Sequence, residues 1–395
     1  MALEQQQKRT SVLDKNSQID GFVAEGFEVV ADLFQANFSN RAEVGAAFSA
    51  MVDGKVVVDL WGGVRDKATG ERWSKDTLQL TFSGTKGPVA GVILMLVDRG
   101  LISLDEPVAT YWPEFAQHGK AEITVGDVLG HRAGLPSLEG TVSEDDLLDP
   151  VGLAARLANQ KPLWPNASQA SYHALTYGWL CGEIVRRVTG ASIGQFVRTE
   201  IAEPLGLDLW IGLPAELEAR ASQLCLGEDF HAVKEHICSG PGGDRYGKPG
   251  LFDEPLMWNQ PRFHQAEIPG VNAMVDARSM ATFYGCLALG GTLGNVRLAS
   301  PETIEKFVVE RTRSNDALSG EPLAFGAGFM LQSQGSAFGP AVTAYGHTGA
   351  GGSVHGMWPR FRTGFSYITN EMRDDTDDDR TRGILAALYT AVCCG

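Results

Sequence analysis

The residues whose types and spacing could do chemistry lie in 81–87, where a serine and a lysine stand three positions apart. The apolar residues behind this pair recur at helical spacing: Val89, Val92, Ile93, Leu96 and Val97. Ser83 is therefore predicted to lie in the first turn of a helix, with Lys86 one turn further along the same face. The alternative is a capping serine followed by a solvated lysine.

This pair could perform nucleophilic catalysis. A serine hydroxyl is a weak nucleophile at neutral pH, and a lysine whose charge is disfavoured by burial can help to remove its proton. The free N–H groups and partial positive charge at a helix N-terminus would stabilise an oxyanion beside Ser83. Such a pair would support an acyl-enzyme mechanism, and the rest of the chain must decide between this chemistry and the capping alternative.

Composition limits the possible partners. The chain has 395 residues, 44% hydrophobic and 21% charged, which is typical of a soluble globular protein. Its net charge of −15 argues against a nucleic-acid partner. Residues 1–20 contain no apolar leader and no later run has the length of a membrane span, so we expect no membrane partner and a cytoplasmic protein. The sequence makes no prediction of oligomeric state.

Neither a metal nor a cofactor is expected. The six cysteines show no Cys-x-x-Cys spacing, which favours free thiols over a zinc site or a disulfide framework. His231 and His236 are five positions apart and would lie on different faces of a helix. The sequence also lacks the Gly-x-Ser-x-Gly motif of α/β-hydrolases.

The elements that must position Ser83 and Lys86 divide into strand-rich ends and a helical middle. Apolar spacing over 23–38 predicts a helix, and alternation around Asp53-Gly54 predicts a hairpin of strands 46–52 and 55–61. The remaining expected elements are helices at 151–158, 175–188, 274–289 and 384–393, and strands at 326–332, 342–346, 353–358 and 365–370. The acidic residues 374–379 would complement the dipole of the last helix.

Strands from both ends can share one antiparallel sheet if the helical middle is an excursion from it. We therefore expect an α+β architecture. Its sheet domain would be discontinuous, formed by 1–85 and 290–395, and its mainly helical domain would be 86–289. The active site is expected at the junction, where clefts commonly lie.

Further motifs follow the serine–lysine pair in order. They are Arg-Gly-Leu-Ile-Ser-Leu-Asp-Glu-Pro-Val at 99–108, Leu-Gly-His-Arg-Ala-Gly-Leu-Pro at 129–136, Tyr-His-Ala at 172–174 and His-Thr-Gly at 347–349. In order and spacing these motifs resemble the serine β-lactamase and penicillin-binding protein superfamily, most closely its family VIII carboxylesterases. The resemblance implies a five-stranded antiparallel sheet flanked by helices, with a helical second region.

The resemblance also implies roles for three side chains. Ser83 would be the nucleophile, Lys86 its activating partner and Tyr172 the second proton carrier. Tyr177 is the competing tyrosine, but it falls on the apolar stripe of the following helix, whereas Tyr172 lies in a polar approach to that helix. A phenol has a pKa of about 10, so Tyr172 needs a nearby cation such as Lys86 to act near neutral pH. His131 is expected to order its loop.

His347 and Gly349 lie where these families carry Lys-Thr-Gly on a strand beside the substrate. A mostly neutral imidazole would bind a carboxylate poorly, and Ala174 replaces the asparagine that many relatives use to hold an amide. Gly349 lets the backbone approach substrate, and the N–H of Ala350 would join that of Ser83 in the oxyanion hole. The alternative for His347 is a satisfied core histidine.

These residues predict a serine carboxylesterase that hydrolyses short-chain, small-molecule esters through an acyl-enzyme on Ser83. One alternative is a β-lactamase or D-amino peptidase on the same scaffold. The other is a catalytically silent homologue that serves as a binding protein.

Overall fold

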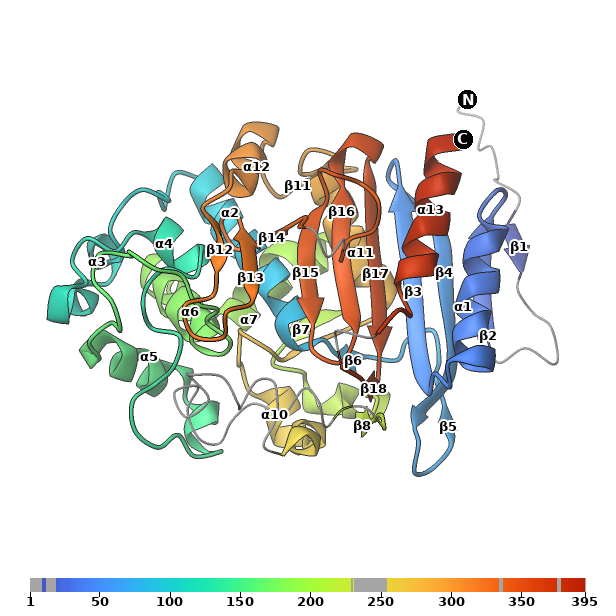
Figure 1. The fold of residues 1–395 in the computed structure, drawn as a ribbon, viewed down its shortest axis with the longest axis horizontal. Helices are drawn as coiled ribbons and strands as arrows, with labels where there is room; N and C mark the ends of the chain where they lie inside the picture. Colours follow the sequence, from blue (N-terminus) through green and yellow to red (C-terminus); the bar gives the residue numbers. More distant parts are fainter. Residues whose placement is uncertain are drawn as a thin grey trace.

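The computed structural model describes residues 9–11, 19–228, 230, 254–333, 337–374 and 378–394. Strands from both ends of the chain pair in one antiparallel sheet, in the order β1-β2-β4-β3-β17-β16-β15-β14-β13-β12, with β5 paired to β4 (Figure 1). The expected α+β architecture is confirmed. The sheet is wider than the five strands that the resemblance implies, because further strands flank its central β4-β3-β17-β16-β15 portion.

The strands of this sheet are β1 (Arg9–Ser11), β2 (Ile19–Ala24), β3 (Gly45–Val52), β4 (Lys55–Asp66), β5 (Glu71–Arg72), β12 (Thr312–Asn315), β13 (Pro322–Phe325), β14 (Met330–Leu331), β15 (Tyr345–Gly349), β16 (Ser353–Trp358) and β17 (Thr363–Thr369). Smaller sheets pair β6 (Gln79–Leu80) and β7 (Leu209–Ile211) with β9 (Ala273–Val275), β10 (Thr292–Leu293) with β11 (Val296–Arg297), and β8 (Cys225–Leu226) with β18 (Glu371–Met372).

The α-helices are α1 (Glu28–Asn40), α2 (Lys86–Asp98), α3 (Val108–Tyr111), α4 (Val125–Leu129), α5 (Pro150–Asn159), α6 (Thr176–Thr189), α7 (Ile193–Phe196), α8 (Glu203–Leu205), α10 (Pro261–Gln265), α11 (Ala277–Ala288), α12 (Pro301–Val308) and α13 (Arg382–Cys394). Shorter helical turns are η1 (Phe82–Thr85), η2 (Pro113–Gly119), η3 (Asp146–Leu148), η4 (Val197–Ala202), η5 (Ala215–Arg220), η7 (Pro255–Asn259) and η8 (Pro359–Phe361).

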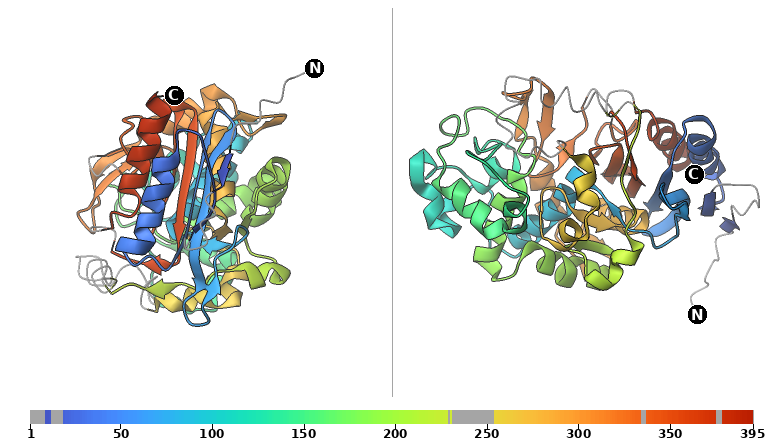
Figure 2. Two further views of the ribbon diagram at one scale, coloured as in Figure 1. Left: turned by 90° about the vertical axis from the view of Figure 1, so that its right-hand side faces the viewer. Right: turned by 90° about the horizontal axis from the view of Figure 1, so that it is seen from below.

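Helices cover both faces of the central sheet. Gly364 on β17 faces α11, where an added Cβ would meet backbone atoms of that helix. Its neighbour Phe365 packs in the core that also contains residues of α1 and α13. Because successive side chains of a strand point to opposite faces, α11 lies on one face of the sheet and α1 and α13 lie on the other. Figure 2 shows α1 and α13 side by side. Figure 1 shows α3 to α6 on the side of the sheet that ends in β12.

The predicted hairpin is confirmed, but the predicted start of the first helix at Val23 is wrong. β3 and β4 are joined by Asp53 and Gly54, both with positive φ (48° and 76°), as a tight two-residue turn requires. Val23 does not begin a helix but lies on β2, where it pairs with Val58 of β4. Its apolar side chain fits the spacing of either element, and pairing with a buried strand decides the outcome.

Several other expectations need correction. The expected helix 274–289 begins only at Ala277, because β9 takes the preceding residues and Asp276 caps the helix by accepting from Ser279 N–H at 2.6 Å. The expected strand 326–332 is reduced to β14. The strand expected at 342–346 begins only at Tyr345, as β15. Of the acidic run before the last helix, Asp378 and Asp379 pair with Arg380 and Arg41, and Asp375 and Asp377 lie outside the described residues.

Within the described ranges, no helix is long and apolar enough to cross a membrane. No group of three or more His, Cys, Asp or Glu side chains in the same ranges could hold a metal ion. The described cysteines are free thiols: Cys181, Cys225, Cys286, Cys393 and Cys394. The remaining candidates His231, His236 and Cys238 lie outside the described residues.

Candidate active site

Ser83 lies on η1, the turn of helix that leads directly into α2 at Lys86. The preceding residue, Phe82, has a left-handed φ of 45°, which is uncommon for a bulky residue and costs on the order of 1–3 kcal/mol. Phe82 is held there by burial, with its ring edge-on to Trp258 at 6.2 Å. The Ser83 side chain remains partly exposed at the end of this strained turn.

Lys86 is fully buried, and its three hydrogen bonds define its role. Nζ lies 3.2 Å from Ser83 Oγ and 2.8 Å from each of the carbonyl oxygens of Ala174 and Gly270. Burial lowers the pKa of Lys86 to about 7, so the neutral amine is well populated near neutral pH. In that form the two N–H bonds can serve the two carbonyls, and the nitrogen lone pair is left for the Ser83 hydroxyl.

Tyr172 lies on the loop before α6, next to the lysine. Its ring centroid is 4.9 Å from Lys86 Nζ, and the side chain is partly exposed. The loop is anchored by Asp316, whose Oδ2 accepts from the Tyr172 N–H at 2.6 Å and whose Oδ1 accepts from the Ser171 hydroxyl at 2.9 Å. The structure therefore brings together Ser83, Lys86 and Tyr172, as predicted from the sequence.

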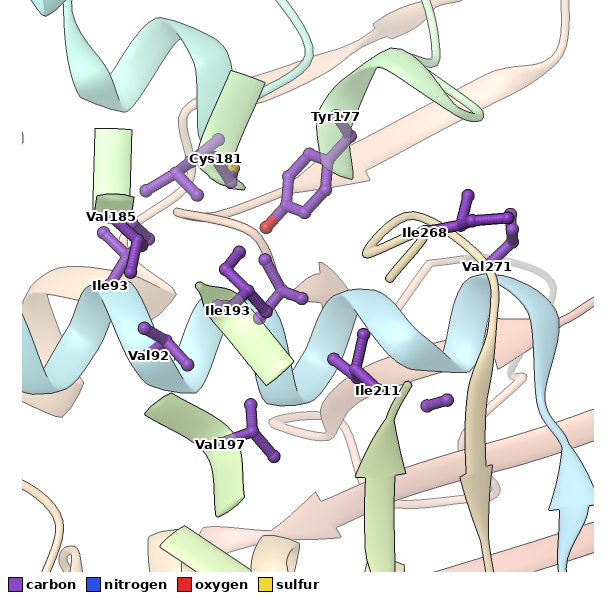
Figure 3. Packing of buried hydrophobic residues seen from close by; sticks show 14 of the residues in the cluster. Val92, Ile93, Tyr177, Cys181, Val185, Ile193, Val197, Ile211, Ile268 and Val271 are labelled. Carbon is purple, nitrogen blue, oxygen red and sulfur yellow. The ribbon is translucent and has the colours of Figure 1, made fainter. Parts of the chain in front are cut away.

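Tyr177 has the core position expected for it. Its side chain is completely buried and belongs to the same apolar cluster as Val92 of α2 and Cys181 of α6 (Figure 3). Burial raises the pKa of the Tyr177 hydroxyl well above 10. A phenol in this environment is a poor proton acceptor, which favours Tyr172 as the functional tyrosine.

His131 and His173 shape the loop that carries Tyr172. The His131 ring lies 4.7 Å from the Tyr172 ring, and its Nδ1 accepts from the His173 N–H at 3.0 Å. Burial holds the pKa of His131 well below 6.5 and lowers that of His173 to about 4. Both imidazoles are therefore neutral at pH 7 and act through packing and hydrogen bonds.

His347 is buried on β15 and faces the same aromatic group. Its ring lies 6.2 Å from that of Tyr172 and 5.9 Å from that of Phe325. Nδ1 is 2.7 Å from the Thr348 carbonyl, so it carries the proton of the neutral ring. Burial, followed by the nearby charge of Lys86, lowers the pKa of His347 to about 3. This position therefore supplies no cation at neutral pH.

Gly349 lies against the start of η1, and Ala350 follows it in the chain. A Cβ on Gly349 would lie 2.1 Å from the Thr81 carbonyl oxygen, so only glycine allows this approach. The Gly352 N–H donates to the Gly349 carbonyl at 3.3 Å and closes a turn with Ala350 at its second position. No acceptor for the Ala350 N–H is present within the described part of the chain. This geometry is suited to an oxyanion hole shared with the N–H of Ser83.

Two residues that position the site were missed by sequence reasoning. Asp316 anchors the Tyr172 loop from a hairpin 144 positions away. Arg380 contacts the Gly349–Gly352 turn through the Gly351 carbonyl, at 2.7 Å. Neither residue stands in a motif with its partner, so no local signal in the sequence indicates these contacts.

Comparison with known proteins gives a consistent result. The beta-lactamase family model matches residues 30–389. The esterase/beta-lactamase LipL of Mycobacterium tuberculosis is 35% identical over 375 residues, covering 91% of this chain and 84% of that protein. The crystal structure of a family VIII carboxylesterase matches with a TM-score of 0.86 and 36% identity, over 94% of this chain and 99% of that one.

A penicillin-binding protein homologue from Caulobacter crescentus matches over the same shares of the two chains, with a TM-score of 0.85 and 36% identity. The family model covers every strand of the large sheet except β1 and β2, together with the helical region, and it includes every residue of the candidate site. The β-lactamase-like fold that the motifs predicted is confirmed. The chain belongs to the beta-lactamase family.

Proposed function

We propose that this protein is an esterase that hydrolyses short-chain carboxylic esters through an acyl-enzyme on Ser83. The observation that carries the proposal is the 3.2 Å contact between Ser83 Oγ and a buried lysine amine whose other partners are two carbonyls. Further support comes from relatives at 35% and 36% identity, named an esterase/beta-lactamase and a family VIII carboxylesterase.

In the first half of the reaction, the Ser83 hydroxyl proton passes to the pair formed by Lys86 and Tyr172. Oγ attacks the ester carbonyl, and the N–H groups of Ser83 and Ala350 stabilise the oxyanion that forms. The same pair returns the proton to the leaving alcohol as the C–O bond breaks. An acyl group is left on Ser83.

In the second half, water attacks the acyl carbonyl and gives its proton to the same pair. Collapse of the tetrahedral intermediate releases the carboxylic acid and restores the hydroxyl of Ser83. One group can serve in both halves because the buried amine of Lys86, with a pKa of about 7, exchanges its proton readily near neutral pH.

The preference for neutral esters is supported by what stands beside the nucleophile. His347 is neutral at pH 7, so a substrate carboxylate would find no charge-assisted partner there, a loss of roughly 1.5–3 kcal/mol. Ala174 has no amide side chain, and its carbonyl already accepts from Lys86. β-Lactams and D-amino peptides would lose both contacts, which makes them the weaker alternative.

A hydrolysis panel tests the proposal. p-Nitrophenyl esters of increasing chain length, a chromogenic cephalosporin and a D-alanyl-D-alanine peptide would be compared for kcat/KM, with Ser83→Ala as the control. Highest activity on the short esters, lost in the control, supports the esterase. A cephalosporin or peptide that is hydrolysed as fast as the best ester would overturn the proposal. Failure of a fluorophosphonate to label the protein would favour a catalytically silent homologue.

A further inference from the structure

The turn that presents the Ala350 N–H is intrinsically soft. Three of its four residues are glycines, and Gly351 and Gly352 have φ values of 86° and 110°, a region that other residues rarely adopt. Its closing hydrogen bond, from Gly352 N–H to Gly349 O, is long at 3.3 Å. A backbone donor is useful to an oxyanion only if it is held in place before the reaction, so this turn needs an external support.

Arg380 supplies a contact to this turn from outside the site. Its side chain is completely buried, and Nη2 donates to the Gly351 carbonyl at 2.7 Å. A Cβ added to Gly352 would meet Nη2 at 2.4 Å and Asp378 Oδ2 at 2.2 Å, so the guanidinium and its carboxylate lie directly against the backbone of the turn.

The guanidinium is itself fixed from the opposite side. Nη1 donates to both carboxylate oxygens of Glu43 at 3.1 Å and to the Thr369 hydroxyl at 3.1 Å, and Nε donates to Asp378 at 2.9 Å. Glu43 also accepts from the Tyr367 hydroxyl on β17, at 2.6 Å. The planar fork of Arg380 thus links the turn to the centre of the sheet.

We propose that Arg380 is a positioning residue for the oxyanion hole, which holds the Ala350 N–H in place by fixing the Gly351 carbonyl to the buried Glu43 and Asp378. The proposal rests on the proposed acyl-enzyme function. Arg380 touches no reacting atom, so it acts on catalysis only through the turn. A lysine cannot replace it, because one ammonium cannot span both carboxylates and the carbonyl with the geometry of the fork.

The test compares Arg380→Lys with a matched control, Arg278→Lys. Arg278 also joins two buried carboxylates, Asp59 and Asp276, at 3.0 and 3.1 Å, but it lies on α11 and none of its hydrogen bonds reaches the turn. Each variant would be measured for unfolding free energy, for kcat and KM on the best ester, and for affinity toward a trifluoromethyl ketone, whose adduct places an oxyanion in the hole.

Arg380→Lys is expected to lower kcat, and the affinity for the trifluoromethyl ketone, by at least about tenfold each. KM should stay within about twofold of the natural protein's value, since an oxyanion donor acts mainly in the transition state. Arg278→Lys should lose stability but keep its kcat. A folded Arg380→Lys with normal kcat, or an equal loss of kcat in Arg278→Lys, would overturn the proposal.

Glu43→Gln keeps the test decisive if Arg380→Lys does not fold. It weakens the support of the guanidinium but leaves the bond to Gly351 intact, so a smaller fall in kcat is expected with KM unchanged. Normal kcat in this variant, with Arg380→Lys unfolded, would count against the proposal. If the natural protein hydrolyses a lactam rather than esters, the proposed substrate class fails, and the same comparison made on the lactam still tests Arg380.

Discussion

Lys86 Nζ lies 3.2 Å from Ser83 Oγ at the point where η1 passes into α2. Because two carbonyl oxygens occupy the other directions around this nitrogen, the contact with the serine is the one that a lone pair can use. Burial supplies the second requirement, since it lowers the pKa of the amine to about 7. The position of Lys86 and its protonation state thus both allow it to accept the proton of the Ser83 hydroxyl.

The tyrosine next to this pair can be identified by substitution. Lys86→Ala and Tyr172→Phe are each expected to lower kcat by at least about a hundredfold, because in the proposed mechanism both groups carry the proton of Ser83. Tyr177→Phe is the matched control and should have much less effect, since its hydroxyl is buried in the core. Steady-state kinetics on folded variants would decide. A large loss in Tyr177→Phe with little loss in Tyr172→Phe would reverse the assignment.

The pH dependence of kcat/KM should follow the protonation of Lys86. The pKa is lowered from 10.5 to about 7, and the neutral form is the one that accepts the proton, so activity should rise with pH through about 7. The pKa values of His347 and His173 are held at about 3 and about 4, so neither imidazole produces this inflection. A profile that stays flat between pH 6 and pH 8 would contradict the role of the lysine.

Acidification should not convert the protein into a better β-lactamase. His347 has a pKa of about 3 and stays neutral at pH 5, so no cation appears to meet the lactam carboxylate. The ratio of ester to cephalosporin kcat/KM, measured at pH 5 and at pH 7 with blanks for spontaneous hydrolysis, should not fall on acidification. A cephalosporin rate that rises as the pH is lowered would show that His347 becomes charged and contacts the substrate.

Asp316 should act on turnover through the Tyr172 loop. Asp316→Ala removes the acceptor for the Tyr172 N–H and is expected to lower kcat by about tenfold or more, since small displacements of a proton carrier are costly. Asp316→Asn keeps one acceptor oxygen and should recover part of the loss. Asn315→Ala, at the exposed neighbouring position, is the control. Equal activity in all three variants would show that Asp316 does not affect the function of Tyr172.

The sequence was sufficient where the contact is local. Ser83 and Lys86 are one helical turn apart, and Tyr177 falls on the apolar stripe of α6, so their contact and the core position of Tyr177 follow from spacing. The role of Tyr172 was implied by the family resemblance. Val23 shows the limit of inference from spacing, because an apolar residue at this spacing suits a helix and a strand equally. Its place on β2 depends on pairing with Val58, far along the chain.

Contacts between distant segments could not be predicted in this way. The sequence indicated a mostly neutral His347, but the burial that lowers its pKa to about 3 comes from packing in the fold, where the rings of Tyr172 and Phe325 lie beside it. Asp316 and Arg380 act on backbone groups rather than on side chains of a motif, so their partners leave no pattern in the sequence. Only the folded chain brings them together.

The most direct test of the account is the site of covalent modification. The natural protein would be treated with a fluorophosphonate, digested and analysed by mass spectrometry, with Ser83→Ala treated in parallel. The account predicts one adduct, on the peptide that contains Ser83, no adduct in Ser83→Ala, and a loss of several orders of magnitude in kcat in that variant. An adduct on another serine, or near-normal turnover by Ser83→Ala, would contradict it.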